Sequence, residues 1–349
     1  MRKGRGTVKG GRAALPDVYD YMDEHGLQRG LNNALMLQRA LARGVEVQAG
    51  RDNRLQMSFQ GKSAWFNASN SSLNRGLVKR VAGNKAVTAA FLRAEGLQAP
   101  ENAAFNADEV QRAWDWAEPI APVVVKPWTG QEGRLVHLDL STYADFEQAF
   151  TAVAGEGHPV LVEQYISGVD HRVTVVRGRV VGATRRVAAH VVGDGRATVE
   201  ALVEAKNVQR RASRNPVHKE LSIGRIESQH LARQGLTSTS IPAEGRTVWL
   251  RGAANVSTGG DAIDATDDLT AAEVEYIERA VAVFPGMRFC GVDVLLDRDS
   301  GADPWIVEVN SKPSVAPHHY PWEGQPRDVM TAVLEAMFPN LPPSPNGAT

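Results

Sequence analysis

The sequence contains a single cysteine, Cys290, among 349 residues. One cysteine excludes an internal disulfide and a cysteine-based metal cluster, and it fits the reducing cytoplasm. Because Cys290 precedes a predicted apolar strand, we assign it to the core and not to a nucleophile. No apolar run is long enough to cross a bilayer, and no apolar signal segment follows the basic, glycine-rich residues 1–13. We therefore expect a cytoplasmic protein that does not bind membranes.

The sequence also lacks an excess of charge of either sign. Lysine and arginine (39) balance aspartate and glutamate (40), and the formal net charge is −1. This balance gives no electrostatic reason to expect a nucleic-acid partner. The phosphate-binding patterns GxGxxG and GxxxxGK[ST] are missing as well, which argues against the usual nucleotide-binding loops.

Predicted strands and helices follow one another without the regular alternation of a doubly wound sheet. Three short strands are predicted between residues 45 and 69, after a helix within 26–44. Residues 170–192 alternate like a meander of strands. A helix is also predicted within 141–157, with Ser141 as its expected N-cap. This order predicts an α+β fold with antiparallel sheets.

The segment "GVDVLLDRDSGADPWIVEVNSKP" (291–313) predicts a hairpin with acids inside apolar strands. A turn at Ser300–Gly301 places Asp293 opposite Glu308, with Asn310 on the same face and four valines (292, 294, 307, 309) on the other. Like charges directly opposite each other destabilise a sheet, so a cation is expected. Two carboxylates and an amide oxygen suit Mg²⁺ and do not suit zinc. The alternative is an exposed sheet face that carries ordinary surface acids.

Two lysines stand where cations could meet phosphates. Lys126 ends the buried run Val123–Val125 and precedes the loop "WTGQEG", and Lys85 opens a helix. Taken singly, each lysine is better explained as a solvated surface cation. The segment "LVEQYISGVD" adds an extended stretch that could pair with an adenine edge, and Asp170 follows as an acceptor for ribose hydroxyls. Its alternative is a plain strand and turn.

The order of these motifs resembles the ATP-grasp family. The matching pieces are "GNKAVTAAFLRAEGLQAP", "VVVKP", "VEQYISGVDHRV" and the acid hairpin ending in "EVN". The segments "VVGDGRATVEALVEAKN", "LRGAANVSTGGDAIDATD" and "HHYPWEGQPRDVMTAVLEAMFP" look like the ATP-grasp part of cyanophycin synthetases, and the related domain of bifunctional glutathione synthetases is also similar. The resemblance runs from about residue 55 to residue 338.

The resemblance implies an ATP-grasp fold, in which two α+β subdomains grip ATP. We expect a small N-terminal region (1–75), an ATP-grasp domain (76–340) with a lid subdomain at about 121–165, and a disordered tail (341–349). It further implies a ligase that activates a carboxylate as an acyl phosphate and joins it to an amine, with ATP and Mg²⁺ as cofactors. The alternatives are a glutathione-like tripeptide ligase and a degenerate nucleotide-binding regulatory protein.

The resemblance assigns roles to individual residues. Lys85 and Lys126 would hold the α- and β-phosphates, with Arg172 at the transferring phosphate and Arg251 at the acyl phosphate. The adenine and ribose contacts would come from Glu163, Gln164, Tyr165, Ile166 and Asp170. The metal ligands would be Asp293, Glu308 and Asn310.

Substrate contacts are expected from polar loops and one basic segment. The loops "SNSS" and "NVSTGG" can bind carboxylates through N–H groups, and the basic segment 210–220 could cover an anionic substrate. The candidate substrate residues are Ser69, Ser71, His218, Asn255, Ser257 and Ser314. Plain loop chemistry explains "SNSS" equally well. Asn84 and "NSKPS" depart from the family pattern, and the partner halves of the larger relatives are not found. These departures favour a stand-alone peptide ligase of a natural-product pathway. The resemblance further implies a homo-oligomer, a dimer or a tetramer.

Overall fold

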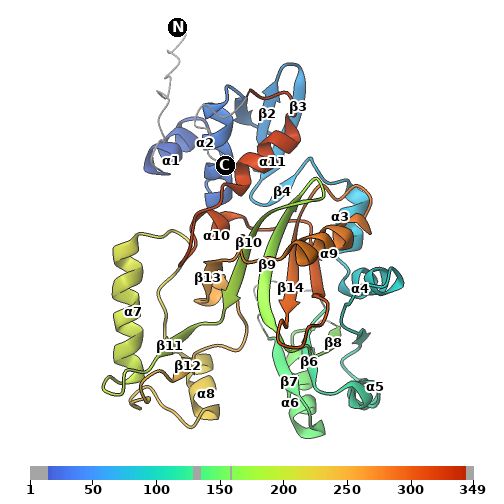
Figure 1. The fold of residues 1–349 in the computed structure, drawn as a ribbon, viewed down its shortest axis with the longest axis vertical. Coiled ribbons are helices and arrows are strands. Elements are labelled where there is room, and N and C mark those ends of the chain that lie inside the picture. The colour runs from blue at the N-terminus through green and yellow to red at the C-terminus, as the bar shows by residue number, and fades with distance from the viewer. Residues whose placement is uncertain (1–14, 129–134, 158, 343–349) are drawn as a thin grey trace.

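The computed structural model describes residues 15–128, 135–157 and 159–342 and shows four antiparallel sheets (Figure 1). The α+β prediction is confirmed, because helices and antiparallel sheets are mixed along the chain. The basic start of the chain, most of the loop "WTGQEG" and nearly all of the predicted tail 341–349 lie outside the described residues. Among the helices described, none has the length and apolarity needed to cross a bilayer.

The first part of the chain is a small helix–sheet unit. Its sheet runs in the order β1-β2-β3-β4 and packs on α2, which buries Leu35, Met36 and Leu37. The late helices α10 and α11 pack against the same unit, so the two ends of the chain share one core (Figure 1). The elements are α1 (Leu15–Glu24), α2 (Leu31–Ala42), β1 (Glu46–Ala49), β2 (Leu55–Phe59), β3 (Lys62–Asn67), β4 (Asn70–Ser71), α10 (Ala316–His319) and α11 (Val329–Met337).

The central sheet has the order β13-β10-β9-β14-β15. One face is covered by apolar side chains of α3, α4 and α9, which pack on Val292, Val294 and Ile306. On the other face, α10 and α11 pack against β9 and β10, and the remainder lines the cavity described below. Its elements are α3 (Gly76–Ala82), α4 (Lys85–Ala94), β9 (Val169–Val176), β10 (Arg179–Val187), β13 (Asp261–Asp264), α9 (Ala271–Ala282), β14 (Phe289–Leu296) and β15 (Trp305–Asn310).

A second α+β unit carries its own sheet, in the order β5-β8-β6-β7, with α5 and α6 on an aromatic core around Trp114, Phe146 and Phe150. The lid boundary of 121–165 stays a prediction, and the structure places β5, which precedes it, in the same sheet. The helix α6 is capped by Thr142 and not by Ser141, because the Thr142 hydroxyl accepts the N–H of Asp145 at 3.2 Å. The elements are β5 (Asn102–Phe105), α5 (Val110–Ala117), β6 (Val123–Pro127), β7 (His137–Leu140), α6 (Tyr143–Ala154) and β8 (Val160–Gln164).

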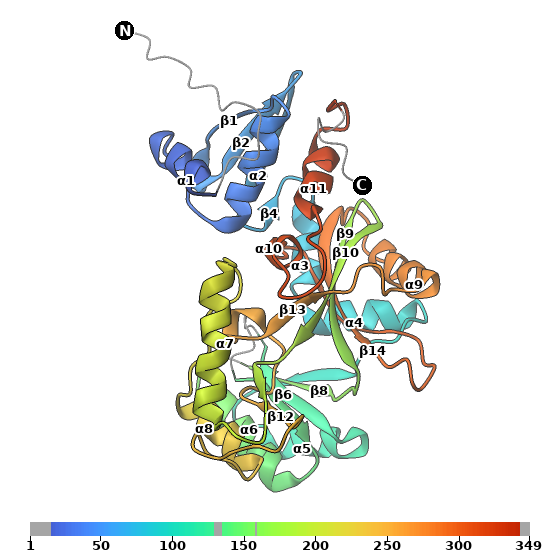
Figure 2. The same ribbon diagram turned by 60° about the vertical axis from the view of Figure 1, so that its left-hand side comes forward.

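The remaining segment forms an arm beside the central sheet. In Figures 1 and 2 the long helix α7 stands beside that sheet, with β12 and α8 near its lower end. Buried leucines and valines join these elements in a separate small core. The arm consists of β11 (His190–Val192), α7 (Val199–Ser213), α8 (Arg225–Arg233) and β12 (Thr247–Trp249). Elsewhere in the described residues, short 3-10 helices span 51–53, 118–120 and 256–258.

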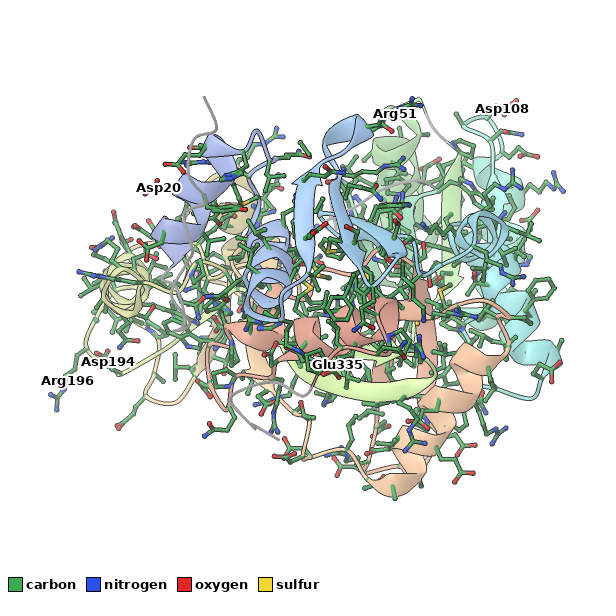
Figure 3. The ribbon with its side chains drawn as sticks, turned by 90° about the horizontal axis from the view of Figure 1, so that it is seen from above. Asp20, Arg51, Asp108, Asp194, Arg196 and Glu335 are labelled. Carbon is green, nitrogen blue, oxygen red and sulfur yellow. The ribbon has the colours of Figure 1, made fainter. Side chains whose placement is uncertain are left out.

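Ordinary surface charge lies at the rim of the molecule. Seen from above, the labelled residues Asp20, Arg51, Asp108 and Arg196 lie at the periphery (Figure 3). Some charged residues lie inside the molecule instead, and several of these line the cavity described below.

Cys290 gives a direct test of the core assignment. The residue is fully buried on β14, and burial raises the pKa of its thiol to about 12. We expect a thiol reagent at pH 8 to modify the folded protein slower, by orders of magnitude, than the protein in denaturant. Modification of the folded protein at the denatured rate would contradict the fold described here.

Candidate active site

One large cavity of about 1590 Å³ lies where the four parts of the chain meet. Its walls come from the central sheet, the β5–β8 unit, the arm and the loops of the N-terminal unit. All twelve residues predicted for catalysis, cofactor and metal line it: Lys85, Lys126, Glu163, Gln164, Tyr165, Ile166, Asp170, Arg172, Arg251, Asp293, Glu308 and Asn310. The fold therefore brings together side chains that are widely separated in the sequence.

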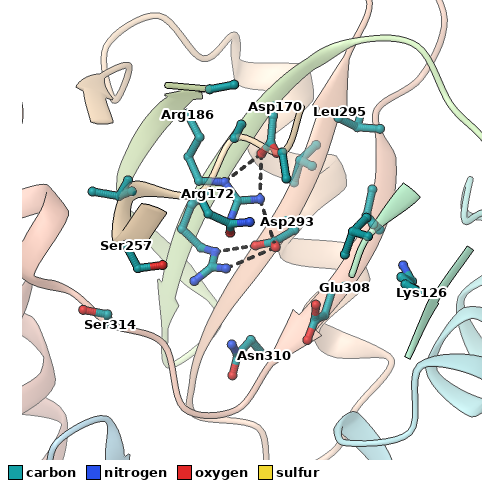
Figure 4. Close-up of a pocket in the computed structure, with 18 of the residues that line it drawn as sticks. Lys126, Asp170, Arg172, Arg186, Ser257, Asp293, Leu295, Glu308, Asn310 and Ser314 are labelled. Atoms are coloured by element: carbon teal, nitrogen blue, oxygen red, sulfur yellow. Dashed lines mark hydrogen bonds and ion pairs between the residues drawn. The ribbon is translucent and has the colours of Figure 1, made fainter. Parts of the chain in front are cut away.

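The centre of the cavity wall is a cluster of two aspartates and two arginines (Figure 4). Asp293 on β14 lies directly opposite Arg172 on β9, and the Arg172 guanidinium donates to both of its carboxylate oxygens. Arg186 on β10 bridges Asp293 at 3.0 Å and Asp170 at 2.7 Å. Each carboxylate therefore has an arginine partner, as burial requires.

This cluster fixes the protonation state of Asp293. Burial acts to raise the pKa of its carboxyl, but the charges and hydrogen bonds of Arg172 and Arg186 outweigh burial and hold the pKa at about 2. The carboxylate is therefore ionised at neutral pH. The charges and hydrogen bonds of Asp293 and Asp170 in turn raise the pKa of Arg186 despite its burial, so this guanidinium stays protonated, whereas burial raises the pKa of the Asp170 carboxyl.

The hairpin prediction is confirmed in its register and corrected in one detail. Asp293 pairs with Glu308, as expected, and Asn310 lies two residues further along β15. A β-bulge then shifts the pairing, so that Val294 faces Ile306 and not Val307. As a result Ile306 joins the core, whereas Val307, expected on the core face, lines the cavity.

The two predicted lysines contact the predicted acids. Lys85 at the start of α4 lies 3.4 Å from Glu308, and the α4 N-cap is Asn84, whose side chain accepts the N–H of Val87 at 3.1 Å. Lys126 on β6 donates to Glu163 on β8 at 2.5 Å, and both are buried. The second carboxylate oxygen of Glu163 has no hydrogen-bond partner among the described residues.

The segment after β8 offers one backbone donor to the cavity. The N–H groups of Gln164 and Tyr165 are already bonded to Glu101 and Pro122, at 2.8 and 3.0 Å. Among the described residues the N–H of Ile166 has no such partner. Together with the unpaired Glu163 oxygen it gives a donor and an acceptor at one end of the cavity, and this combination suits the edge of an adenine.

The arm contributes the predicted Arg251. Its guanidinium is held by Glu227 of α8 at 2.6 Å, and Glu227 itself accepts the N–H of Gly224 at the start of that helix. Two further predicted residues, Asn255 and Ser257, line the same part of the cavity. The arginine is thus oriented by a residue that sequence reasoning did not single out.

The substrate candidates divide into two groups. Ser69 and Ser314 line the cavity, and the Asn32 amide donates to both hydroxyls, at 3.1 and 3.5 Å. Ser71 and His218 are buried and do not line it. The His218 ring accepts the N–H of Ala262 at 3.0 Å, and burial lowers its pKa to about 4. Ser71 and His218 are therefore not proposed as substrate contacts.

Three cavity or supporting residues escaped the sequence reasoning: Asn32, Arg186 and Glu227. The partners of Arg186 lie 16 and 107 residues away, so no local spacing reveals them. Strand alternation could have shown that Arg186 shares a face with Thr184 and differs from Arg185. Within the described residues no three histidines, cysteines, aspartates or glutamates gather as a metal centre. The predicted Mg²⁺ ligands include two carboxylates, so phosphate oxygens would have to complete the coordination.

Comparison with known proteins identifies the fold. The chain is 28% identical to a crystal structure of a bifunctional glutathione synthetase from Pasteurella multocida, with a TM-score of 0.64 over 89% of this chain and 43% of that one. The fold and the cavity define an ATP-grasp protein. Residues 82–218 match the RimK-like ATP-grasp domain. The chain thus contains a RimK-like ATP-grasp domain, homologous to those of the relatives below.

Two curated relatives agree with this assignment. Cyanophycin synthetase of Nostoc sp. (strain PCC 7120 / SAG 25.82 / UTEX 2576) is 36% identical over 264 residues, or 74% of this chain and 29% of that enzyme. The glutathione biosynthesis bifunctional protein GshAB of Mannheimia succiniciproducens is 34% identical over 273 residues, or 74% of this chain and 35% of that protein. The family resemblance seen in the sequence is confirmed. The chain spans about a third of the length of these relatives.

The cluster predicts a specific stability effect. Arg186→Met would leave two carboxylates to share Arg172, so we expect a loss of about 3 kcal/mol in the free energy of unfolding, measured with urea. Arg179→Met on the same strand is the control, because the Arg179 side chain is 78% exposed against 14% for Arg186. Its surface pair with Glu278 is worth about 0.5 kcal/mol. Equal effects of both changes would contradict the role of the cluster.

Proposed function

We propose that this chain is an ATP-dependent carboxylate–amine ligase that joins amino acids or short peptides. One observation carries the proposal: a single cavity collects the nucleotide-type pair Lys126–Glu163, the carboxylate set on β14 and β15, and the arginines Arg172 and Arg251. The ATP-grasp fold of the chain and its homology to ligases support the same reaction class.

The nucleotide would lie between the central sheet and the β5-β8-β6-β7 sheet. The unpaired oxygen of Glu163 would accept a hydrogen bond from the adenine amino group, and the N–H of Ile166 would donate a hydrogen bond to a ring nitrogen. Asp170 would accept from the ribose, which requires Arg186 to turn toward the phosphates. Lys85 and Lys126 would neutralise the α- and β-phosphates.

The residues of the hairpin fit Mg²⁺. Among the described residues Glu308 has one ion pair, with Lys85 at 3.4 Å, and the Asn310 side chain accepts the N–H of Lys312 at 2.9 Å. Bound Mg²⁺ would neutralise and align the triphosphate. Asp293 would join this set only after it exchanges an arginine contact for the ion.

In the reaction a carboxylate oxygen of the acyl donor attacks the γ-phosphorus, and ADP leaves. The amine then attacks the acyl carbon, the carbon–oxygen bond breaks, and phosphate leaves with the carboxylate oxygen. Both steps build negative charge on oxygen. Arg172 and Arg251 would stabilise that charge, and the contacts of Arg172 with Asp293 and of Arg251 with Glu227 support this role because they orient both guanidinium groups.

The alternatives are less well supported. A degenerate nucleotide-binding protein has no need of the metal-type residues Glu308 and Asn310 in the same cavity as Arg251. A glutathione-like tripeptide ligase remains a variant of the same reaction class. A cytoplasmic location, a homo-oligomeric state and a place in a natural-product pathway stay predictions.

The reaction class is tested by the products of ATP cleavage. We expect ADP and phosphate only when a carboxylate and an amine are both supplied, because each step needs its own acceptor. A panel of amino acids and short peptides, including glycine with a γ-glutamyl dipeptide, is scored by phosphate release and by mass spectrometry of the product. Release of AMP in place of ADP would contradict the acyl-phosphate mechanism.

Glu308 is the sharpest single residue to change. Glu308→Gln keeps the shape but removes the charge that would hold Mg²⁺, so we expect kcat to fall by about 100-fold or more. The unfolding temperature should change little, since Glu308 has only one distant ion pair. Glu275→Gln on the exposed side of α9 is the control and should leave kcat unchanged. Full activity of Glu308→Gln would disprove the metal assignment.

A further inference from the structure

Two lysines at one end of the cavity have no part in the chemistry described so far. Lys79 comes from α3 and Lys312 from the loop that follows β15. Both line the cavity, on the side of the N-terminal unit and away from Lys126 and Glu163.

A network of amide side chains holds the loops around these lysines together. Asn32 donates to Ser69 and Ser314 and accepts the N–H of Ala316 at 3.2 Å. Asn74 is buried and donates to the carbonyl of Ser311 at 3.2 Å. The loop that carries Lys312 is therefore fixed against the N-terminal unit, next to α3.

Lys79 is held in place by neutral partners only. Its ammonium donates to the side-chain oxygen of Asn70 and to the carbonyl of Ser71, both at 2.7 Å, and lies 5.0 Å from the centre of the Trp65 ring. An ammonium has three N–H donors, so one remains. Burial first, and then the charges of Lys312 and Arg54, lower the pKa of Lys79.

Among the described residues, neither lysine has an acidic partner that offsets its charge. The lysine ion pairs among the described residues involve Lys85, Lys126 and Lys206 only. Two cations that repel each other in a partly buried site are costly unless an anion binds between them. The absence of a protein carboxylate here leaves that role to a ligand.

The charge balance of the whole cavity points the same way. Ten lysines and arginines line it against four aspartates and glutamates, although the chain as a whole carries a formal net charge of −1. Mg²⁺ neutralises much of the charge of a bound triphosphate. A surplus of cations therefore remains for the other substrates.

We propose that Lys79 and Lys312 form an anion subsite that binds a second carboxylate of the acyl donor, so that the enzyme selects acidic acyl donors. The inference rests on the proposed ligase function. Lys312 follows Asn310 by two residues, and the acyl donor is the substrate whose reacting carboxylate must reach the γ-phosphate there. A side chain that extends from that point meets the lysines.

The test separates the acyl donor from the amine. Hydroxylamine replaces the amine and converts the acyl phosphate to a hydroxamate with release of phosphate. The donors are matched pairs with and without the second carboxylate: aspartate and asparagine, glutamate and glutamine, and dipeptides that end in them. We expect the acidic member of the accepted pair to have a kcat/KM at least about tenfold higher.

The two lysine variants should remove this preference. In Lys79→Met and in Lys312→Met we expect the kcat/KM ratio of the pair to fall to about threefold or less, through KM for the acidic donor, with kcat for the amide donor unchanged. Lys62→Met, on an exposed position of β3 outside the cavity, is the control and should keep the ratio. Unfolding temperatures confirm that the variants fold, and Lys312→Met, at an exposed position, serves if Lys79→Met does not.

Three results would overturn the proposal in distinguishable ways. Hydroxamate formed equally well from both members of every pair would reject the subsite while leaving the ligase function intact. A preference for a phosphorylated donor over the dicarboxylic one would reject its assignment to a carboxylate. Failure to form hydroxamate or ADP with any donor would reject the ligase function, and the subsite with it.

Discussion

The structure depends on the placement of Asp293, a carboxylate buried in the second strand from the edge of a five-stranded sheet. A buried charge is tolerated only with a partner of opposite sign. Here the adjacent strand β9 supplies Arg172, and β10, the next strand beyond it, supplies Arg186. Arg172 and Arg186 therefore keep Asp293 ionised and rigid. Cations fixed beside a carboxylate are also what phosphoryl transfer demands, so the interaction that makes the sheet stable prepares it for chemistry.

The same principle extends outward along the cavity. Lys126 pairs with Glu163, Lys85 with Glu308 and Arg251 with Glu227. In each pair the acid orients a cation that faces the cavity, and each cation comes from a different structural element. Lys79 and Lys312 are the exception, since they line the cavity with no acidic partner among the described residues.

Local patterns of the sequence predicted much of this arrangement. The period of two in a strand placed Asp293 opposite Glu308, and an apolar run located Lys126 at the end of β6. Features that depend on distant contacts were beyond reach. The bulge that turns Val307 into the cavity follows from packing against the core. Arg186 has partners far away in sequence, and the polar His218 proved to be buried. Ser141 and Thr142 both carry a hydroxyl that could cap a helix, and in the structure the N-cap of α6 is Thr142, whose hydroxyl accepts the N–H of Asp145.

The central claim is that a carboxylate oxygen of the acyl donor attacks the γ-phosphorus of ATP. An acyl donor labelled with ¹⁸O in its reacting carboxylate tests this claim most directly. The account predicts that one labelled oxygen per turnover appears in the released phosphate, alongside ADP, because the carbon–oxygen bond of the acyl phosphate breaks when the amine attacks. Labelled oxygen in AMP, or phosphate without label, would contradict it.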